Sequence, residues 1–299
     1  MNQIPFLIHC LRHDLATPKD PIEQRQLLRA VMNVHNPNDP IPEAYWMVQD
    51  ELLQAETRQK GVVTLDALTP IAPQIYLWQG DITRLQTDAI VNAANSQLLG
   101  CFHPLHACID NAIHSAAGLQ LRQACFELME KQGQPEATGK AKITPAFNLP
   151  SKFVLHTVGP IIYENVNETD RTLLADCYRS WLELAKTNDL NSVAFCCIST
   201  GEFHFPNQLA AEIAVETVRA FLNKHPKMKV VFNVFKEVDW AIYQITIGKI
   251  IKKVRLILKM FYTNRTFYFQ ILPRLFNHQN PYSALRVGNV FGADAGVES

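Results

Sequence analysis

Apolar and polar positions divide the chain into a helical first part and a second part in which short apolar runs alternate with amphipathic segments. In the first 66 residues, apolar side chains recur at helical spacing, which predicts helices over residues 21–32 and 43–58. Asp20 and Pro21 are typical of an N-cap and a first helical position. This segment carries no evident chemistry, and we expect it to be a helical cap on the rest of the protein.

From about residue 74 the pattern becomes one of alternating strands and helices. It predicts strands over residues 75–78, 88–93, 153–158, 193–198 and 229–235, and helices over 109–130, 171–186 and 206–223, with a closing helix from 237. This alternation is typical of α/β proteins in which helical layers cover both faces of a largely parallel sheet. We therefore predict a three-layer α/β/α domain over residues 71–244, preceded by a helical extension over residues 1–70.

The composition is that of a globular protein. Hydrophobic residues make up 47% of the 299 residues, charged residues make up 19%, and the net charge is zero, so the overall balance does not favour nucleic-acid binding. The seven cysteines are odd in number, lack disulfide-like spacing and follow no signal peptide, which favours a reducing cytoplasm. No apolar stretch reaches the roughly 18–20 residues of a transmembrane helix. We expect a monomer without a membrane span.

Residues 245–299 differ in composition from the rest, because they are rich in lysine and arginine and nearly free of acidic residues. Apolar residues between 247 and 261 recur at helical spacing with basic residues off that stripe, which is typical of a basic amphipathic helix. Such a helix suits a membrane surface, a partner groove or packing on the domain. The lack of turn residues favours another origin, a read-through or frame-shifted end that is no part of the fold.

Four residues of the types that bind zinc lie within eight positions: Cys101, His103, His106 and Cys108. Pro104 keeps this stretch out of a regular helix, so the side chains can converge on one point. Zinc prefers thiolate and imidazole ligands, and a catalytic site keeps one position open. Three ligands with an open position would form a reaction centre, whereas four would form a structural site.

Two loops follow predicted strands, where open α/β sheets bind their ligands. One covers residues 92–108 and contains the zinc-type residues. The other covers residues 199–205, contains Gly201 and precedes a predicted helix. Glycine permits close backbone approach, and a helix N-terminus offers free N–H groups and positive dipole. The second loop therefore suits a pyrophosphate.

Four motifs resemble those of macrodomains in order and spacing: Gly80-Asp81-Ile82, Val91-Asn92-Ala93-Ala94-Asn95, His156-Thr157-Val158-Gly159-Pro160 and Ile198-Ser199-Thr200-Gly201. The stretch 100–114 resembles the zinc-dependent microbial macrodomains, and the resemblance covers about residues 1–244. Those enzymes remove mono-ADP-ribose from proteins and are often encoded beside a sirtuin-type ADP-ribosyltransferase and a lipoyl-carrier protein. The resemblance implies a mixed, largely parallel sheet, one zinc ion per chain, and an ADP-ribosylated protein, such as that carrier, as the substrate.

The resemblance also implies roles for individual residues. Asp81 would accept from the adenine amino group with the Ile82 backbone nearby, Asn95 would hold the distal ribose, and Asn92 would shape its loop. The loop 199–205, with Ser199, Thr200, Gly201 and Glu202, would wrap the diphosphate, and Phe203 would lie along the distal ribose. Zinc would be held by Cys101, His106 and Cys108, with His103 as the competing ligand. The position of Asp110, directly after this loop at the start of a predicted helix, suits a base, an orienter of a zinc-bound histidine, or an ordinary carboxylate in the first turn of a helix.

The function predicted from the sequence is a zinc-dependent hydrolase that removes mono-ADP-ribose from modified proteins, with Cys101, His106, Cys108, Asn95 and Asp110 at the reaction centre. An ester to aspartate or glutamate is the linkage we expect. Two alternatives use the same pocket: a module that binds ADP-ribose without cleaving it and holds a structural zinc, and a deacetylase acting on O-acetyl-ADP-ribose. A zinc deaminase is disfavoured, because its His-x-Glu and Pro-Cys-x-x-Cys pattern does not occur.

Overall fold

The computed structural model describes residues 3–249, and its chain begins with three helices that pack on one another. These are α1 (Gln3–Leu11), α2 (Pro21–Val34) and α3 (Glu43–Lys60). Asp20 caps α2 as predicted, because its carboxylate accepts from the N–H groups of Ile22 and Glu23 at 2.9 Å each. Leu7, Leu28 and Tyr45 are fully buried between the helices. The sequence pattern did not predict α1.

Within the described residues, seven strands form one mixed sheet in the order β2-β3-β9-β8-β5-β7-β6. The strands are β2 (Pro70–Ala72), β3 (Ile75–Gln79), β5 (Ala89–Ala94), β6 (Ala141–Pro145), β7 (Phe153–Val158), β8 (Ser192–Phe195) and β9 (Lys229–Val234). The five central strands run parallel, whereas β2 and β6 pair antiparallel at the two edges. A separate parallel pair joins β1 (Val63–Thr64) to β4 (Leu85–Gln86). The predicted mixed, largely parallel sheet is confirmed.

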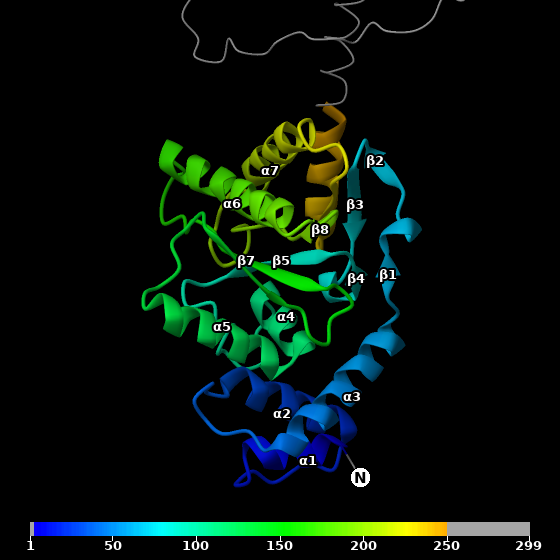
Figure 1. Ribbon diagram of the computed structural model, residues 1–299, viewed down its shortest axis with the longest axis vertical. Coiled ribbons are helices and arrows are strands. Elements are labelled where there is room, and N and C mark those ends of the chain that lie inside the picture. Colours follow the sequence, from blue (N-terminus) through cyan, green and yellow to red (C-terminus); the bar gives the residue numbers. More distant parts are fainter. Residues whose placement is uncertain (1–2, 250–299) are drawn as a thin grey trace, which may run out of the picture. The chain divides into compact units, whose positions relative to one another are not determined.

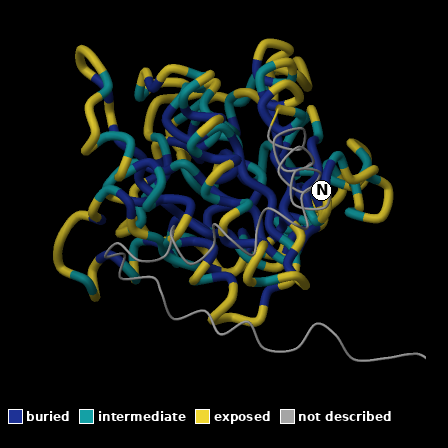
Figure 2. The backbone as a smooth tube through the Cα atoms, turned by 90° about the horizontal axis from the view of Figure 1, so that it is seen from above, coloured by how far each residue is buried: buried dark blue, intermediate teal, exposed yellow. Residues whose placement is uncertain are grey.

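Helices cover both faces of the sheet, which confirms the three-layer prediction (Figure 1). One face carries α4 (Ile109–Ala117) and α5 (Leu119–Gln132), and the other carries α6 (Glu168–Thr187) and α7 (Asn207–Leu222). Figure 2 shows that buried residues gather in the middle of the molecule and exposed ones on the outer turns. Between the sheet and α6, the rings of Tyr178, Trp181 and Phe195 lie within 5.9 Å of one another.

Two predicted elements differ from the structure. The single helix expected over residues 109–130 is wrong, because the chain breaks into α4 and α5 at Gly118, whose φ of 93° is left-handed. The strand expected over 193–198 ends at Phe195, and the chain begins a turn at Ile198. Strand β6 escaped prediction because Lys142 and the small Ala141 make it a weak apolar run at the sheet edge.

The closing helix begins at 237 and is described as far as residue 249, and Tyr243 and Ile247 on it are buried. Most of the amphipathic helix predicted over residues 247–261 and most of the segment 245–299 lie outside the described residues. None of the helices described between residues 3 and 249 has the length and apolarity needed to cross a membrane.

Candidate active site

The predicted ligand residues lie along one edge of the sheet, where the parallel strands end. Asp81 follows β3, Asn95 follows β5, Gly159 follows β7, and the loop 199–205 follows β8. The register places these strands side by side, so the segments that follow them are neighbours in space. This is the edge at which α/β sheets bind ligands.

Asp81 lies at the β3 end of this edge. One carboxylate oxygen, Oδ1, accepts from the N–H of Thr83 at 3.0 Å and from its hydroxyl at 2.7 Å. Among the described residues, none donates to the other oxygen, which leaves it available to a ligand donor. Ile82 is 1% exposed, so its side chain belongs to the core.

An exposed aromatic residue, Phe235, directly follows β9 and was not identified from the sequence; its backbone oxygen accepts from Gln79 Nε2 of the neighbouring β3 at 3.4 Å. Its side chain is 76% exposed, although it directly follows the buried Val234. The N–H of Gly80 donates to the Val234 oxygen at 2.9 Å, so the ends of β3 and β9 are held together here. A large exposed ring beside a ligand edge is a surface on which a planar group can stack.

The loop 199–205 is folded into a tight turn. The N–H of Phe205 donates to the Ser199 oxygen at 2.9 Å, and that of His204 donates to the Gly201 oxygen at 3.0 Å. Within the described residues, the N–H groups of Gly201, Glu202 and Phe203 have no acceptor. Free N–H groups in succession form a concave site for anions, as the sequence predicted for a diphosphate.

The start of this loop lies very close to the end of β7. A Cβ at Gly159 would lie 2.0 Å from Ser199 Oγ and 3.0 Å from Ile198 Cγ2. Only a glycine allows this approach. The Phe203 oxygen accepts from the N–H of Ile162 at 2.9 Å, which attaches the loop to the segment after β7 a second time.

Asn92, Asn95 and Asp110 form a buried polar network below the zinc-type loop. Asn92 is fully buried on β5, and its amide donates to Asp110 Oδ1 at 2.8 Å. The amide of Asn95 donates to the Gly100 oxygen at 3.0 Å and to Asp110 Oδ2 at 3.4 Å. Asn92 thus acts on the site through Asp110, whereas Asn95 is partly exposed and joins the loop to the carboxylate.

Asp110 is 5% exposed, in the first turn of α4. Burial raises its pKa to about 6, although the Asn92 amide and the positive charge of Arg122 oppose the shift. His114 Nε2 lies 3.5 Å from Asp110 Oδ1, and burial holds the pKa of His114 well below its usual range. A carboxylate in this setting is poised to exchange a proton near neutral pH.

Cys101, His106 and Cys108 converge as predicted, with their ligand atoms all within 4.8 Å of one another. Cys101 Sγ lies 3.5 Å from His106 Nδ1. Cys108 is the N-cap of α4, and its sulfur accepts from the N–H of Asn111 at 3.4 Å. Burial raises the pKa of the Cys108 thiol to about 12, with the neighbouring Cys101 contributing. A bound cation would offset that cost by stabilising the thiolate.

The other nitrogen of His106 faces a carboxylate. His106 Nε2 lies 3.6 Å from Glu202 Oε1, which belongs to the 199–205 loop. Metal-binding histidines commonly orient their second nitrogen toward such a group. The donor set and this arrangement both fit zinc. His103 is exposed and outside the group, and its ring packs edge-on against His106 with 5.3 Å between centroids.

A second buried group of potential ligands, His114, Cys125 and His156, lies behind the network. Thr144 Oγ1 lies 2.9 Å from His156 Nε2, and Asn92 Nδ2 lies 3.3 Å from Nδ1, so both nitrogens of His156 have hydrogen-bond partners. Burial lowers its pKa to about 3, which keeps the ring neutral. This group is best described as interior packing of the site.

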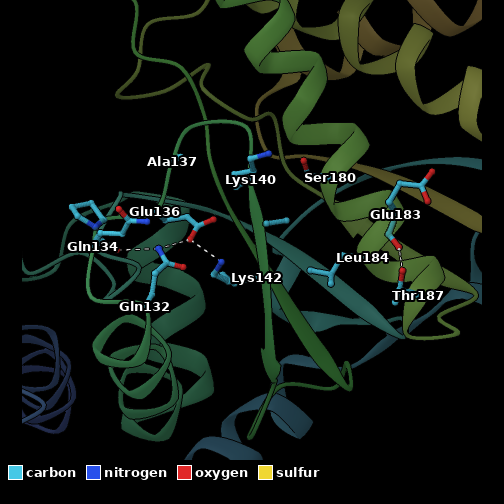
Figure 3. Close-up of a pocket in the computed structure, with 12 residues that line it drawn as sticks. Gln132, Gln134, Glu136, Ala137, Lys140, Lys142, Ser180, Glu183, Leu184 and Thr187 are labelled. Carbon is cyan, nitrogen blue, oxygen red and sulfur yellow. Dashed lines mark hydrogen bonds and ion pairs between the residues drawn. The ribbon is translucent and has the colours of Figure 1, made fainter.

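A separate cleft of about 600 Å³ opens beside the edge strand β6, between α6 and the segment after α5 (Figure 3). Glu136 forms an ion pair with Lys142 in this cleft at 3.1 Å, and Gln132 Nε2 donates to the same carboxylate at 3.0 Å. None of the predicted site residues lines it. The N–H of Glu136 donates to the Ser96 oxygen at 2.8 Å, which connects the cleft wall to the loop after β5.

Comparisons with known proteins identify the family to which this fold belongs. Residues 91–214 match the Macro domain family. The chain is 53% identical over 236 residues to a protein-ADP-ribose hydrolase of Treponema medium, a match that covers 77% of this chain and 90% of that protein. A protein of the same name from Staphylococcus aureus is 46% identical over 81% of this chain and 94% of its own. The crystal structure of a Trypanosoma brucei macrodomain in complex with ADP-ribose matches with a TM-score of 0.57 and 30% identity, covering 76% of this chain and 95% of that one.

Proposed function

Because the chain belongs to the macrodomain family of protein-ADP-ribose hydrolases, we propose that it is a zinc-dependent hydrolase that removes mono-ADP-ribose from aspartate or glutamate side chains of proteins. The observation that carries the proposal is the convergence of Cys101, His106 and Cys108 beside Asn95 and Asp110. A metal-type ligand group and a buried carboxylate thus share the sheet edge at which the ligand would bind.

The ligand would extend along this edge from β3 and β9 to β5. Adenine would lie at Asp81, whose second oxygen is available to the exocyclic amine, with Phe235 beside it. The diphosphate would contact the free N–H groups of the 199–205 loop, and the distal ribose would lie near Asn95. The order of the strand ends supports this direction, because β8 and its loop lie between β9 and β5.

Zinc held by Cys101, His106 and Cys108 would supply Lewis-acid polarisation at the distal ribose. Side chains of the protein would accept the proton and orient the groups of the site. Asn95 and Asn92 fix both oxygens of Asp110, so this carboxylate is oriented to accept a proton from an attacking water. Glu202 would orient the His106 ring through Nε2.

The test is release of ADP-ribose from a protein modified on aspartate or glutamate, measured with and without a zinc chelator. We expect release to stop on chelation and to return when zinc is added. Cys101→Ala and Cys108→Ala should abolish turnover and leave the affinity for free ADP-ribose nearly unchanged. Cys10→Ala, on α1 and outside the site, is the matched control and should behave as the wild type. Full activity of metal-free Cys101→Ala enzyme would refute the proposal.

The same assay separates the two alternatives. Binding of free ADP-ribose without release in either condition would identify a reader with a structural zinc. Release of acetate from O-acetyl-ADP-ribose, with no action on modified protein, would identify a deacetylase. The position of His103 outside the ligand group favours a reaction centre, because only three side chains of the loop then bind the ion.

We further propose that the protein acts in the cytoplasm, since none of its seven cysteines forms a disulfide. A lipoyl-carrier protein modified by a sirtuin-type transferase is a substrate suggested by the sequence resemblance alone. Incubating that modified carrier with the enzyme in the release assay tests it directly.

A further inference from the structure

The loop of residues 101–108 has no regular secondary structure, yet its ligand side chains converge. Its backbone enters through Gly100 with a φ of 80° and passes through Leu105 with a φ of 57°. A non-glycine residue in the left-handed region is held there by its surroundings rather than by its own preference. The contacts that hold this loop come from α2 of the N-terminal extension and from the side chains that α2 contacts.

Arg29 of α2 provides the first contact. Its Nη2 donates to the backbone oxygen of His106 at 3.2 Å and to Asn111 Oδ1 at 2.7 Å, and its Nε donates to the same Oδ1 at 3.2 Å. Asn111 is fully buried in α4, and its amide donates to the His103 oxygen at 3.1 Å. One guanidinium therefore holds the loop at His106 directly and at His103 through Asn111.

Asn33 provides the second contact, one helical turn after Arg29 and on the same face of α2. Its Oδ1 accepts from the N–H of Leu105 at 3.0 Å, at the residue with the left-handed backbone. Its amide donates to Ser115 Oγ at 3.1 Å, and that hydroxyl donates to Asn111 Oδ1 at 3.2 Å. Asn33 is 2% exposed, so water does not compete strongly for these bonds.

Arg122 of α5 connects the end of α2 to the start of the loop. Its Nη1 donates to the oxygens of Met32 and His35 at 2.8 and 2.9 Å, and its Nε donates to the Leu99 oxygen at 2.8 Å. Its guanidinium also lies 4.4 Å from the centroid of the Phe102 ring. Both ends of the loop are thus connected to α2 by charged hydrogen-bond donors, which make the stronger hydrogen bonds.

We propose that Arg29 and Asn33 are positioning residues for the metal site, and that α2 holds Cys101, His106 and Cys108 in the arrangement that binds zinc. A metal site on a loop needs outside support, because ligands must stay within about 0.5 Å of their productive positions. Here that support fixes the backbone at residues 103, 105 and 106, next to the ligands. This inference rests on the proposed function, since it assumes that zinc is the ion bound.

The test is the affinity of the full-length chain for zinc alone, measured by competition with a chromophoric chelator. Arg29→Gln should weaken zinc binding about 10- to 100-fold, the usual effect of losing a group that orients a ligand. The zinc affinity of Arg29→Lys should lie between those of the wild type and of Arg29→Gln, because an ammonium group keeps the charge but cannot reproduce the planar contacts of a guanidinium. The affinity for free ADP-ribose should stay within about twofold of the wild type, a result that general unfolding would not give.

Arg25→Gln is the matched control. Arg25 lies one turn earlier on α2 and makes a similar two-point contact, to Glu56 of α3 at 2.5 and 2.9 Å, away from the loop. Equal zinc affinities of Arg29→Gln and Arg25→Gln would overturn the inference and leave the proposed function intact. A wild-type chain that binds no zinc would overturn both. Should Arg29→Gln fail to fold, Asn33→Ser takes its place with the same expectation.

Discussion

The close approach of Gly159 to Ser199 gives a quantitative prediction for Gly159→Ala. The new methyl group would lie 2.0 Å from Ser199 Oγ, a buried hydroxyl with no partner among the described residues. Rotation of that hydroxyl can relieve the worst contact, but Ile198 Cγ2 at 3.0 Å and Ser199 Cβ at 3.3 Å remain tight. The first turn of the 199–205 loop must therefore shift. Overpacking of this kind costs about 1–3 kcal/mol.

If this free energy is lost from the ligand-binding conformation of the 199–205 loop, binding of ADP-ribose should weaken about 5- to 150-fold, because each 1.4 kcal/mol is a factor of ten in Kd. Titration calorimetry with ADP-ribose measures the change. Zinc affinity should fall less than ADP-ribose affinity, because Cys101, His106 and Cys108 lie in a different loop, and the shifted loop approaches one of them, His106, through Glu202. The double variant Gly159→Ala/Ser199→Ala should recover part of the lost affinity, and Ser199→Ala alone is the control. Wild-type affinity in Gly159→Ala, or no recovery in the double variant, would refute the reasoning.

Two further predictions concern the adenine end and the far side of the sheet. Phe235→Ala should weaken ADP-ribose binding by about 1–3 kcal/mol, the usual value of a base stacked on an aromatic ring. The Tm of the protein should not change, because Phe235 is 76% exposed. An unchanged Kd for ADP-ribose would exclude stacking on this ring. Burial raises the pKa of Asp88, but hydrogen bonds from Lys152 Nζ at 2.7 Å and the Asn191 N–H at 2.9 Å outweigh it, and the net pKa is lowered. Its stabilising effect is therefore present above its unfolded pKa of about 3.9 and is lost as pH falls through the lower folded value. Asp88→Asn should cost about 1–2 kcal/mol at pH 7, and the cost measured by thermal unfolding should shrink steadily as the pH is lowered below about 3.9. A cost that is independent of pH would contradict this cause.

The parts of the site that sequence could predict are those encoded locally. Cys101, His106 and Cys108 lie within one short loop, so their spacing alone limited where their side chains could meet. The loops 92–108 and 199–205 follow apolar runs, and the geometry of parallel sheets brings such segments to one edge, whereas Asp81 was named through the family resemblance. These predictions needed no knowledge of how distant surfaces pack.

The parts that sequence missed depend on contacts between distant segments. Arg29 reads as an ordinary polar position on an amphipathic helix, and its partners lie 77 and 82 residues away in the chain. Phe235 continues an apolar strand pattern, so its exposure is visible only once the strand is seen to end at Val234. Gly118 is tolerated inside many helices, and only its positive φ reveals the break between α4 and α5.

The contacts of α2 with the zinc-type loop bear on how such a site can be inherited or transplanted. The eight residues 101–108 look like a portable insertion, yet their backbone is held by side chains that lie far outside them. Grafting these eight residues alone onto another protein of this fold would carry over the ligands without their scaffold. The smallest transferable unit would instead include α2, Asn111 and Arg122, so the helical extension and the loop should be gained or lost together during evolution.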